Sequence, residues 1–343
     1  MAGITVSDQY DALLTTTLRN YRKQLINNIF EPTRFLSWLM RKRGGGAGIG
    51  TFDLQDGGFK IVEHLLYGKN TTVGFKEAYG EIDVTPMEGM TIAEYPWREV
   101  AGSIVISNKE KRQNSGEHQL INLLKAKTMQ TERSMRDKVS EKLFANVSSE
   151  TAPDITSLLT MVSNTPSSTT LGGVSGATYS WWRNHQADTG AYSSNLLDKL
   201  KTAMNTVSKW GNTDVIICSQ TALEYYERLA DGAGTPANHL RRFPLVRNEK
   251  AAEDLGYEIF TYKGADMLFD FDLASGTPAT GETMIGLNSN HIRLCVDTQT
   301  NFVTGEFVQP KNQTVQVATI LAMLNLTCNN RAAHWILHGI DAS

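Results

Sequence analysis

The feature that most constrains this chain is residues 116–146, which read as one uninterrupted helix. The segment contains no proline and no internal glycine, and its apolar residues recur at helical spacing. Asn114 and Glu117 have the spacing of a capping box at its start. At about 30 residues it far exceeds the average globular helix of about 11–12, so we expect it to lie along a sheet or a neighbouring subunit. Its apolar stripe comprises Leu120, Leu124, Thr128, Met135, Val139 and Leu143.

A β-like region precedes this helix and resembles an arm more than a core. Short strand-like runs, such as residues 59–64 and 81–85, alternate with glycine turns, and polar and apolar residues are closely mixed in them. A region that is polar on both sides forms a poor core, so we expect an extended excursion that reaches over a neighbour. Residues 100–107 form a firmer strand.

The chain after the helix changes from an irregular segment to alternating helices and strands. Residues 196–290 read as a compact α/β unit, and residues 291–343 read as closing strands. Asn329 and Asn330 predict a hairpin between the last two strands. The expected helices are 195–210 and 220–230, and the expected strands are 213–219, 257–263, 267–272, 282–287, 292–297, 302–308, 314–327 and 332–337.

Charge is distributed unevenly along the 343 residues. The formal net charge is −3, from 33 basic and 36 acidic side chains, which argues against a protein that grips duplex DNA over its whole surface. Residues 1–50 carry seven basic and three acidic side chains, a net +4 that leaves −7 on the remainder. This segment reads as an amphipathic helix followed, after Pro32, by a second helix over residues 33–42.

Composition predicts a soluble globular protein. Three cysteines are too few for a disulfide framework or a four-thiolate zinc site. Asp8 and Asp11 stand where a signal peptide would be basic, and no run of about 18 apolar residues is present. We therefore expect neither a signal peptide nor a membrane span.

Two residue sets were weighed as catalytic or metal sites. Asp266, Asp270 and Asp272 are candidate ligands or acid/base groups, but we favour a strand whose carboxylates face solvent while Phe269, Phe271 and Leu273 point inward. His334 and His338, with Cys328, resemble a zinc set, but positions i and i+4 on a strand lie about 13 Å apart. We assign no catalytic, cofactor-binding or metal residue and expect no enzyme.

The order of the parts resembles that of the major capsid proteins of tailed double-stranded DNA bacteriophages, which share the HK97-type fold. The resemblance covers almost the whole chain. Three strings resemble phrases that recur in this family: FDLQDGGFKIVEHLLYGKNTTVGFKEAYGEIDVTPMEGMTIAEYPWREVAGSIVIS (52–107), NSGEHQLINLLKAK (114–127) and GATYSWWRN (176–184).

The resemblance implies an α+β fold with five parts. These are an N-terminal arm (1–46), an extended β E-loop (47–100), a P-domain part with the spine helix (101–195), an inserted α/β A-domain (196–290) and a second P-domain part (291–343). It further implies a virion protein, assembled in the bacterial host cytoplasm without a cofactor or a membrane. Its partners would be other copies in pentamers and hexamers, a scaffolding protein, a portal, an optional decoration protein and packaged double-stranded DNA bound without sequence specificity.

Two residue sets are expected to carry these contacts. The basic residues of the arm would face the interior and meet DNA or scaffold, and large aromatics beside an arginine are typical interface anchors. The inner-face candidates are Arg19, Arg22, Lys23, Arg41, Lys42 and Arg43; the inter-subunit candidates are Phe59, Tyr67, Phe75, Tyr79, Trp181, Trp182 and Arg183. The alternatives are an encapsulin-type shell around an enzyme cargo, and an α/β hydrolase or metal-dependent enzyme that uses residues 196–290.

Overall fold

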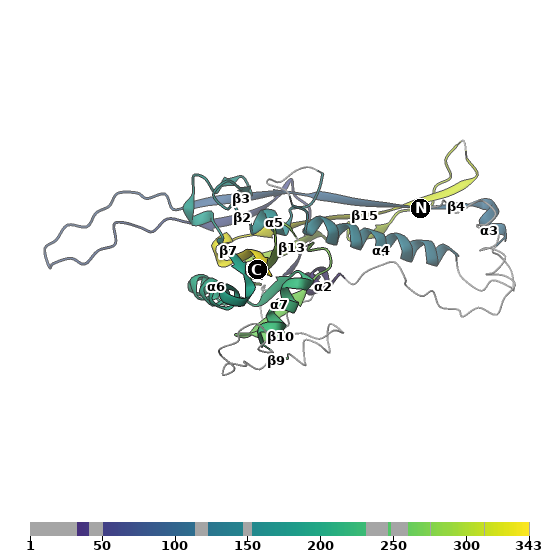
Figure 1. The fold of residues 1–343 in the computed structure, drawn as a ribbon. Coiled ribbons are helices and arrows are strands. Elements are labelled where there is room, and N and C mark those ends of the chain that lie inside the picture. Colours follow the sequence, from purple (N-terminus) through teal and green to yellow (C-terminus); the bar gives the residue numbers. More distant parts are fainter. Residues whose placement is uncertain are drawn as a thin grey trace. The chain divides into compact units, whose positions relative to one another are not determined.

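A computed structural model describes most of the chain. The described residues are 33–40, 51–113, 123–146, 153–230, 246–247, 260–274, 276–311 and 313–342. The chain divides into two compact units. The smaller comprises Met1–Pro32, Glu99–Val139 and Gln299–Met323, and the larger comprises Thr33–Arg98, Ser140–Thr298 and Leu324–Ser343. Figure 1 labels the helices and strands.

The smaller unit combines a long helix with paired strands. Here β15 (Val315–Cys328) pairs with β14 (Val303–Thr304) and with β4 (Arg98–Ser107), and α3 (Asn108–Gln113) follows β4. The predicted long helix is α4 (Leu123–Leu143), and Met135, Val139 and Leu143 of its predicted stripe are buried. Its predicted start and capping box at residues 114–122 lie outside the described residues.

Gly102 shows why β4 and α4 pack closely. A Cβ at this position would lie 2.6 Å from Thr131 Cγ2 and 2.9 Å from Met135 Sδ, both on α4. Only a residue without a side chain therefore fits at this point of the strand.

The larger unit is built on a seven-stranded mixed sheet. The strand order is β7-β16-β12-β8-β11-β10-β9, in which β7 with β16 and β8 with β11 are parallel pairs. Helices α6 (Tyr192–Val207) and α7 (Gln220–Ala230) pack against it. The strands are β7 (His185–Ala191), β8 (Val215–Cys218), β9 (Val246–Arg247), β10 (Phe260–Tyr262), β11 (Ala265–Phe269), β12 (Glu282–Leu287) and β16 (Trp335–Asp341).

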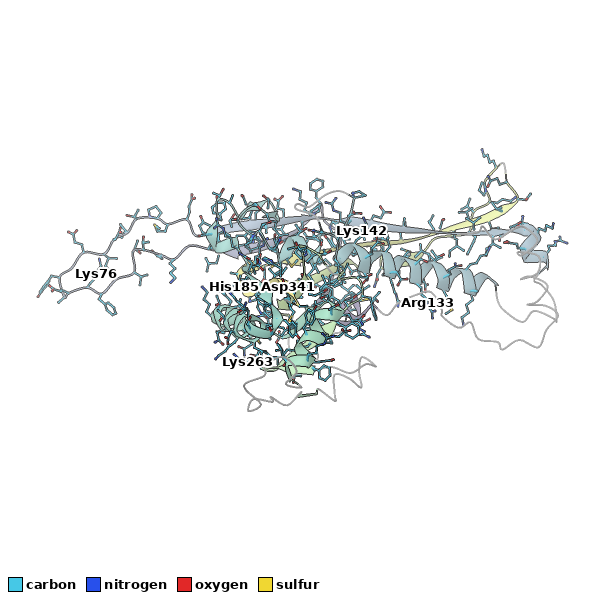
Figure 2. The ribbon with its side chains drawn as sticks, viewed as in Figure 1. Lys76, Arg133, Lys142, His185, Lys263 and Asp341 are labelled. Carbon is cyan, nitrogen blue, oxygen red and sulfur yellow. The ribbon has the colours of Figure 1, made fainter. Side chains whose placement is uncertain are left out.

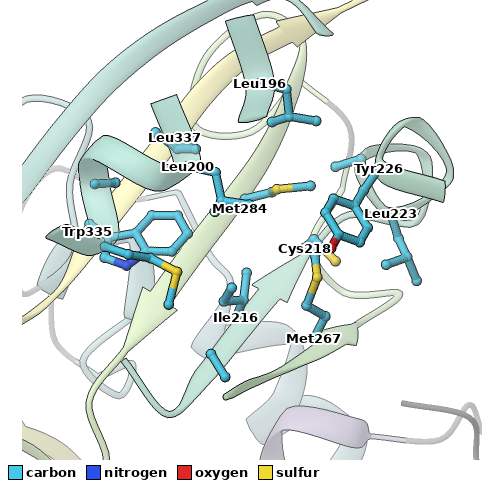
Figure 3. Close-up of a cluster of buried hydrophobic side chains, with 14 of the residues drawn as sticks. Leu196, Leu200, Ile216, Cys218, Leu223, Tyr226, Met267, Met284, Trp335 and Leu337 are labelled. Atoms are coloured by element: carbon cyan, nitrogen blue, oxygen red, sulfur yellow. The ribbon is translucent and has the colours of Figure 1, made fainter. Parts of the chain in front are cut away.

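The core of this unit lies between the sheet and the two helices (Figure 3). Leu200 of α6 and Tyr226 of α7 pack in this core with Trp335 of β16, which is completely buried. Trp335 Nε1 donates to Thr213 Oγ1 at 3.0 Å, which satisfies its one polar atom inside the core. Burial of these large side chains stabilises the unit mainly through the hydrophobic effect.

A second group of strands in the larger unit includes β1, the first strand of the described chain. β1 (Phe52–Gln55) is parallel to β13 (Ile292–Asp297), which is antiparallel to residues 324–328 of β15. The predicted second N-terminal helix is α2 (Arg34–Met40). Short elements complete the unit: α5 (Leu158–Met161), β5 (Thr170–Leu171), β6 (Val174–Ser175), η1 (Ser180–Trp182), η2 (Ser208–Trp210) and η3 (Arg331–Ala333).

Three expectations about strands need correction. The hairpin predicted at Asn329 and Asn330 is wrong, because β15 pairs with β13 while β16 lies between β7 and β12 in the other sheet. Residues 81–85 form no strand, because no strand of the described residues pairs with them. Conversely, β7 lies in a segment expected to be irregular, where HQADTGA has little apolar content.

Candidate assembly surface

The most unusual surface of the larger unit is the hairpin of β2 (Lys60–Leu66) and β3 (Met90–Pro96) with its long connection, residues 67–89. The two strands are antiparallel, with Ile61 opposite Tyr95 and Leu66 opposite Met90. Alternation places Ile61, Leu65, Ala93 and Tyr95 on the buried face. The opposite face of the hairpin therefore points outward.

The root of the hairpin is fixed to the unit through β3. Glu94 N donates to Gly172 O at 3.0 Å, and Tyr95 Oη donates to Cys328 O at 2.9 Å. Asn325 Nδ2 donates to Pro96 O at 2.7 Å. Gly172 has a φ of +59°, and a Cβ there would lie 2.8 Å from Ala93 Cβ, so the turn packs directly on β3.

Arg331 fixes the layer that supports this root. Its side chain is completely buried, and it donates from Nε to Met161 O at 2.6 Å, from Nη2 to Thr160 O at 3.1 Å and from Nη1 to Thr169 O at 3.4 Å. Burial lowers the pKa of Arg331 to about 10, which leaves the guanidinium charged at neutral pH. One side chain thus satisfies carbonyls at the end of α5 and in the loop before β5.

The connection begins at a narrow neck. Tyr67 N and Gly68 N both donate to Gly89 O, at 2.9 and 3.2 Å. A Cβ on Gly68 would lie 2.8 Å from Gly89 Cα, so the two chain segments touch at two glycines. The Tyr67 ring stacks on Trp181 with centroids 5.3 Å apart, which fixes the neck to η1.

Beyond the neck the connection is extended and exposed. In Figure 1 it projects past β2 and β3, and Figure 2 labels Lys76 within it. Its apolar side chains are all exposed, and Phe75 and Tyr79 have essentially the accessibility of an isolated residue. A group of exposed apolar side chains of this kind on a monomer usually marks a binding surface. The set comprises Val73, Phe75, Tyr79, Ile82, Val84 and Met87.

Local hydrogen bonds shape the connection. Gly80 N donates to Glu77 O at 3.0 Å and closes a turn at the tip. Asp83 Oδ1 accepts from Thr85 N at 3.0 Å and from Thr85 Oγ1 at 2.6 Å, and these bonds lower the pKa of the Asp83 carboxyl. Asn70 makes the same pair of bonds with Thr72. These bonds from a side-chain oxygen to the residue two positions on form local Asx turns in the connection.

The structure locates the predicted inter-subunit aromatics at three depths. Phe59 and the loop residues Phe75 and Tyr79 are exposed, while Tyr67 and Trp181 form the partly exposed stack at the neck. Trp182 is a correction: it is only 1% exposed, because it lies inside the unit and donates from Nε1 to Leu171 O. It therefore supports the root and offers no surface to a neighbour.

The remaining predicted contact residues are Arg183 and the basic residues of the N-terminal arm. Arg183 is half-buried and donates to two backbone carbonyls just before it in the chain, from Nε to Gly176 O at 2.6 Å and from Nη2 to Ala177 O at 3.0 Å. The inner-face candidates of the arm all lie outside the described residues: Arg19, Arg22, Lys23, Arg41, Lys42 and Arg43.

The aspartates considered for catalysis have structural partners, and the expected orientation of their strand is wrong. Asp270 is buried and accepts from Phe35 N at 2.8 Å, at the start of α2, while Phe271 is exposed. Burial is the main reason that the pKa of Asp270 is raised. Asp272 accepts from Ser140 Oγ. The chain turns after Phe269, so the alternation expected for a strand ends there.

The histidines considered for zinc also have separate environments. His334 is completely buried and its Nδ1 accepts from Asn288 N at 3.2 Å, whereas His338 Nε2 contacts Gln186 Oε1 at 2.9 Å. Within the described parts of the chain, no three His, Cys, Asp or Glu side chains gather in a metal-binding arrangement. None of the described helices is both long and apolar enough to span a membrane.

The smaller unit has a long helix with paired strands, and the larger unit has a mixed α/β sheet and an extended hairpin arm. No protein-family model matches the sequence, and no curated protein matches it. Solved structures do match, over nearly the full length. The capsid of cyanophage A-1(L) has a TM-score of 0.66 at 14% identity, over 95% of this chain and 97% of that chain.

Two further matches have different biological contexts. The holo-SrpI encapsulin complex from Synechococcus elongatus PCC 7942 has a TM-score of 0.58 at 11% identity, over 100% of this chain and 98% of that chain. The capsid of an empty GTA particle has a TM-score of 0.61 at 9% identity and covers 99% of both chains. These likenesses show that the chain has the HK97-type capsid fold, which confirms the predicted fold class.

Proposed function

We propose that this protein is the major capsid protein of a tailed bacteriophage and has a structural rather than a catalytic role. Its copies self-assemble, as pentamers and hexamers, into an icosahedral head around double-stranded DNA. The observation that carries this proposal is the connection at residues 67–89: an exposed apolar arm on a fixed root. A monomer gains nothing from such an arm, whereas a neighbouring copy can bury it.

The first test is assembly of the purified chain. Size-exclusion chromatography and negative-stain imaging are expected to show large closed particles. Replacing Phe75 and Tyr79 together by aspartate removes the apolar contact and is expected to leave monomers or small oligomers, because burying a charge without a partner is costly. The matched control is Phe75→Leu with Tyr79→Phe, which keeps both side chains apolar and retains particles. Particles of unchanged yield in the aspartate variant would contradict the proposal.

The DNA-enclosing role rests on charge. The remainder of the chain after residue 50 carries −7, and an acidic wall binds packaged DNA weakly enough to let it enter and leave. The basic arm supplies a limited set of contacts to DNA or to a scaffolding protein on the inner face, through Arg19, Arg22, Lys23, Arg41, Lys42 and Arg43. A map of the shell with residues 1–43 on its outer surface would contradict this placement.

The encapsulin-type shell is the second candidate, and the SrpI likeness favours it specifically. The contents of particles isolated from their natural source separate the two functions. The phage head contains long double-stranded DNA that is protected from nuclease, and its particles carry portal and tail proteins. An encapsulin-type shell contains a protein cargo and no such DNA.

A further inference from the structure

Residues 81–85 have the sequence of a strand, but no strand in the described part of the chain pairs with them. Ile82 and Val84 alternate with Glu81, Asp83 and Thr85, which is the period of two expected for a strand with one apolar face. Ile82 is 73% exposed and Val84 is 87% exposed. The alternation is therefore unused in the isolated chain.

The ends of this segment are already set by local structure. The turn closed by Gly80 N and Glu77 O precedes it, and Pro86 follows it. Thr85 N is occupied by Asp83 Oδ1, so the backbone groups of residues 81–84 are those available to a partner strand. Beyond the neck, a side-chain contact joins the two arms, in which Thr71 Oγ1 donates to Met87 Sδ at 3.5 Å. The two arms do not form a ladder with each other.

The root of the hairpin has an unpaired strand edge, on β2, to which a segment such as residues 81–85 could add. β2 pairs with β3 on one side only, and within the described chain no strand pairs with its other edge. The outer edge of β3, by contrast, is covered where Glu94 N bonds to Gly172 O. The outward face beside the open edge carries four exposed apolar side chains, Val62 and Leu66 on β2 and Met90 and Ile92 on β3, together with His64 and the Lys60–Glu94 ion pair. An open apolar edge is a template for another strand.

A chain cannot readily fill its own edge with this segment. Residues 81–85 lie beyond the neck, on the arm that returns to β3, and β2 stands between β3 and the open edge. Folding back would require the connection to cross over β2, and such crossings are rare. A second copy meets no such obstacle.

We propose that residues 81–85 bind a second copy of the chain by strand addition to the open edge of its β2. Ile82 and Val84 then extend the outward apolar face formed by Val62 and Leu66, and backbone hydrogen bonds supply the remaining affinity. The contact is head-to-tail, since the arm and the edge are different surfaces, so it propagates around a ring of copies. This inference rests on the proposed shell function and names the surface that receives the arm.

Mixed single-cysteine variants test the contact. Val84→Cys in one preparation is combined with Val62→Cys or His64→Cys in the other, and the mixture is assembled and oxidised mildly. Side chains on adjacent strands have Cβ atoms about 4.5–5.5 Å apart, close to the geometry of a disulfide. At least one of these mixtures is expected to give a covalent dimer. Native Cys218, Cys295 and Cys328 are all buried and should not compete.

Ile92→Cys provides the matched control. Ile92 lies opposite His64 on the same outward face, but it is one strand farther from the open edge, or roughly 10 Å from an added strand. Crosslinking of Val84→Cys to Ile92→Cys as fast as to β2 would overturn strand addition in favour of docking across the face. Crosslinking within the Val84→Cys, Val73→Cys double variant alone would show instead that the arms pair with each other.

A proline pair separates backbone pairing from side-chain contact. Val84→Pro removes a backbone donor from the segment and is expected to reduce the crosslinked fraction and the particle yield severely. Lys69→Pro, on the other arm at an exposed residue outside the apolar set, is expected to leave both nearly unchanged. Particles that form normally without any β2 crosslink would refute the strand addition alone, whereas a wild-type chain that never forms particles would refute the proposed function itself.

Discussion

At the scale of single residues, Arg331 stabilises the larger unit through three buried hydrogen bonds to backbone carbonyls. Arg331→Met keeps the bulk but removes the buried guanidinium donor from the carbonyls of Thr160, Met161 and Thr169, of which Thr169 O still accepts from Gly176 N. We expect the free energy of unfolding to fall by about 3 kcal/mol, since each unsatisfied buried group costs roughly 1–3 kcal/mol. Arg331→Lys should lose less, because it keeps one charged donor. Denaturant unfolding followed by circular dichroism measures both, and equal stability of wild type and Arg331→Met would contradict this role.

His334 gives the fold a defined response to acid. Burial lowers its pKa from 6.5 to about 3, and the neutral ring accepts from Asn288 N inside the core. Between these two values the unfolded chain binds a proton that the folded chain does not, so stability falls as pH drops from about 6.5 toward 3. His334→Gln removes this contribution. Its free energy of unfolding, though lower at pH 7, should decline less steeply with acid than that of the wild type.

The exposure of some aromatic side chains could be predicted from the sequence, and that of others could not. Exposure of Phe59, Phe75 and Tyr79 follows from their position in a region too polar to form a core, and the structure agrees. Trp181 and its neighbour Trp182 are adjacent and chemically identical, yet one stacks at the neck and the other is buried. No local pattern separates them, because the difference arises from the contact of Trp182 with Leu171 O, eleven residues away.

At the scale of elements, the contact between β4 and α4 yields a prediction. Gly102→Val forces Thr131 and Met135 away from the strand, and overpacking of this kind typically costs about 1–3 kcal/mol. The thermal unfolding temperature should fall accordingly. Gly74→Ala is the control, because a Cβ there meets nothing within 4 Å. If both variants unfold at the wild-type temperature, the close packing of α4 on β4 is wrong.

Elements with strong local periodicity were predictable, and long-range pairing was not. α6 and α7 lie where apolar residues recur at helical spacing, and β8 lies where a short continuous apolar run indicates a buried strand. The partner of β16 was not predictable: an Asn-Asn turn and two apolar strands favour a hairpin, but η3 redirects the chain into the other sheet. Strand order depends on which strand edges remain unpaired once the whole chain has folded, and no local sequence pattern determines that.

At the scale of the whole molecule, assembly should protect the connection from protease. Lys69 and Lys76 lie in the exposed loop of the isolated chain, so trypsin should cut there readily. If a neighbour covers this loop in particles, as we propose, cleavage after Lys76 should slow by about tenfold or more, because protease acts only when the covered loop opens locally. Mass spectrometry assigns each cut, which separates these sites from those elsewhere. The Phe75→Asp, Tyr79→Asp variant provides the unassembled reference under identical conditions. Equal cleavage after Lys76 in particles and in that reference would mean that the arm stays exposed in the shell and that another surface holds the copies together.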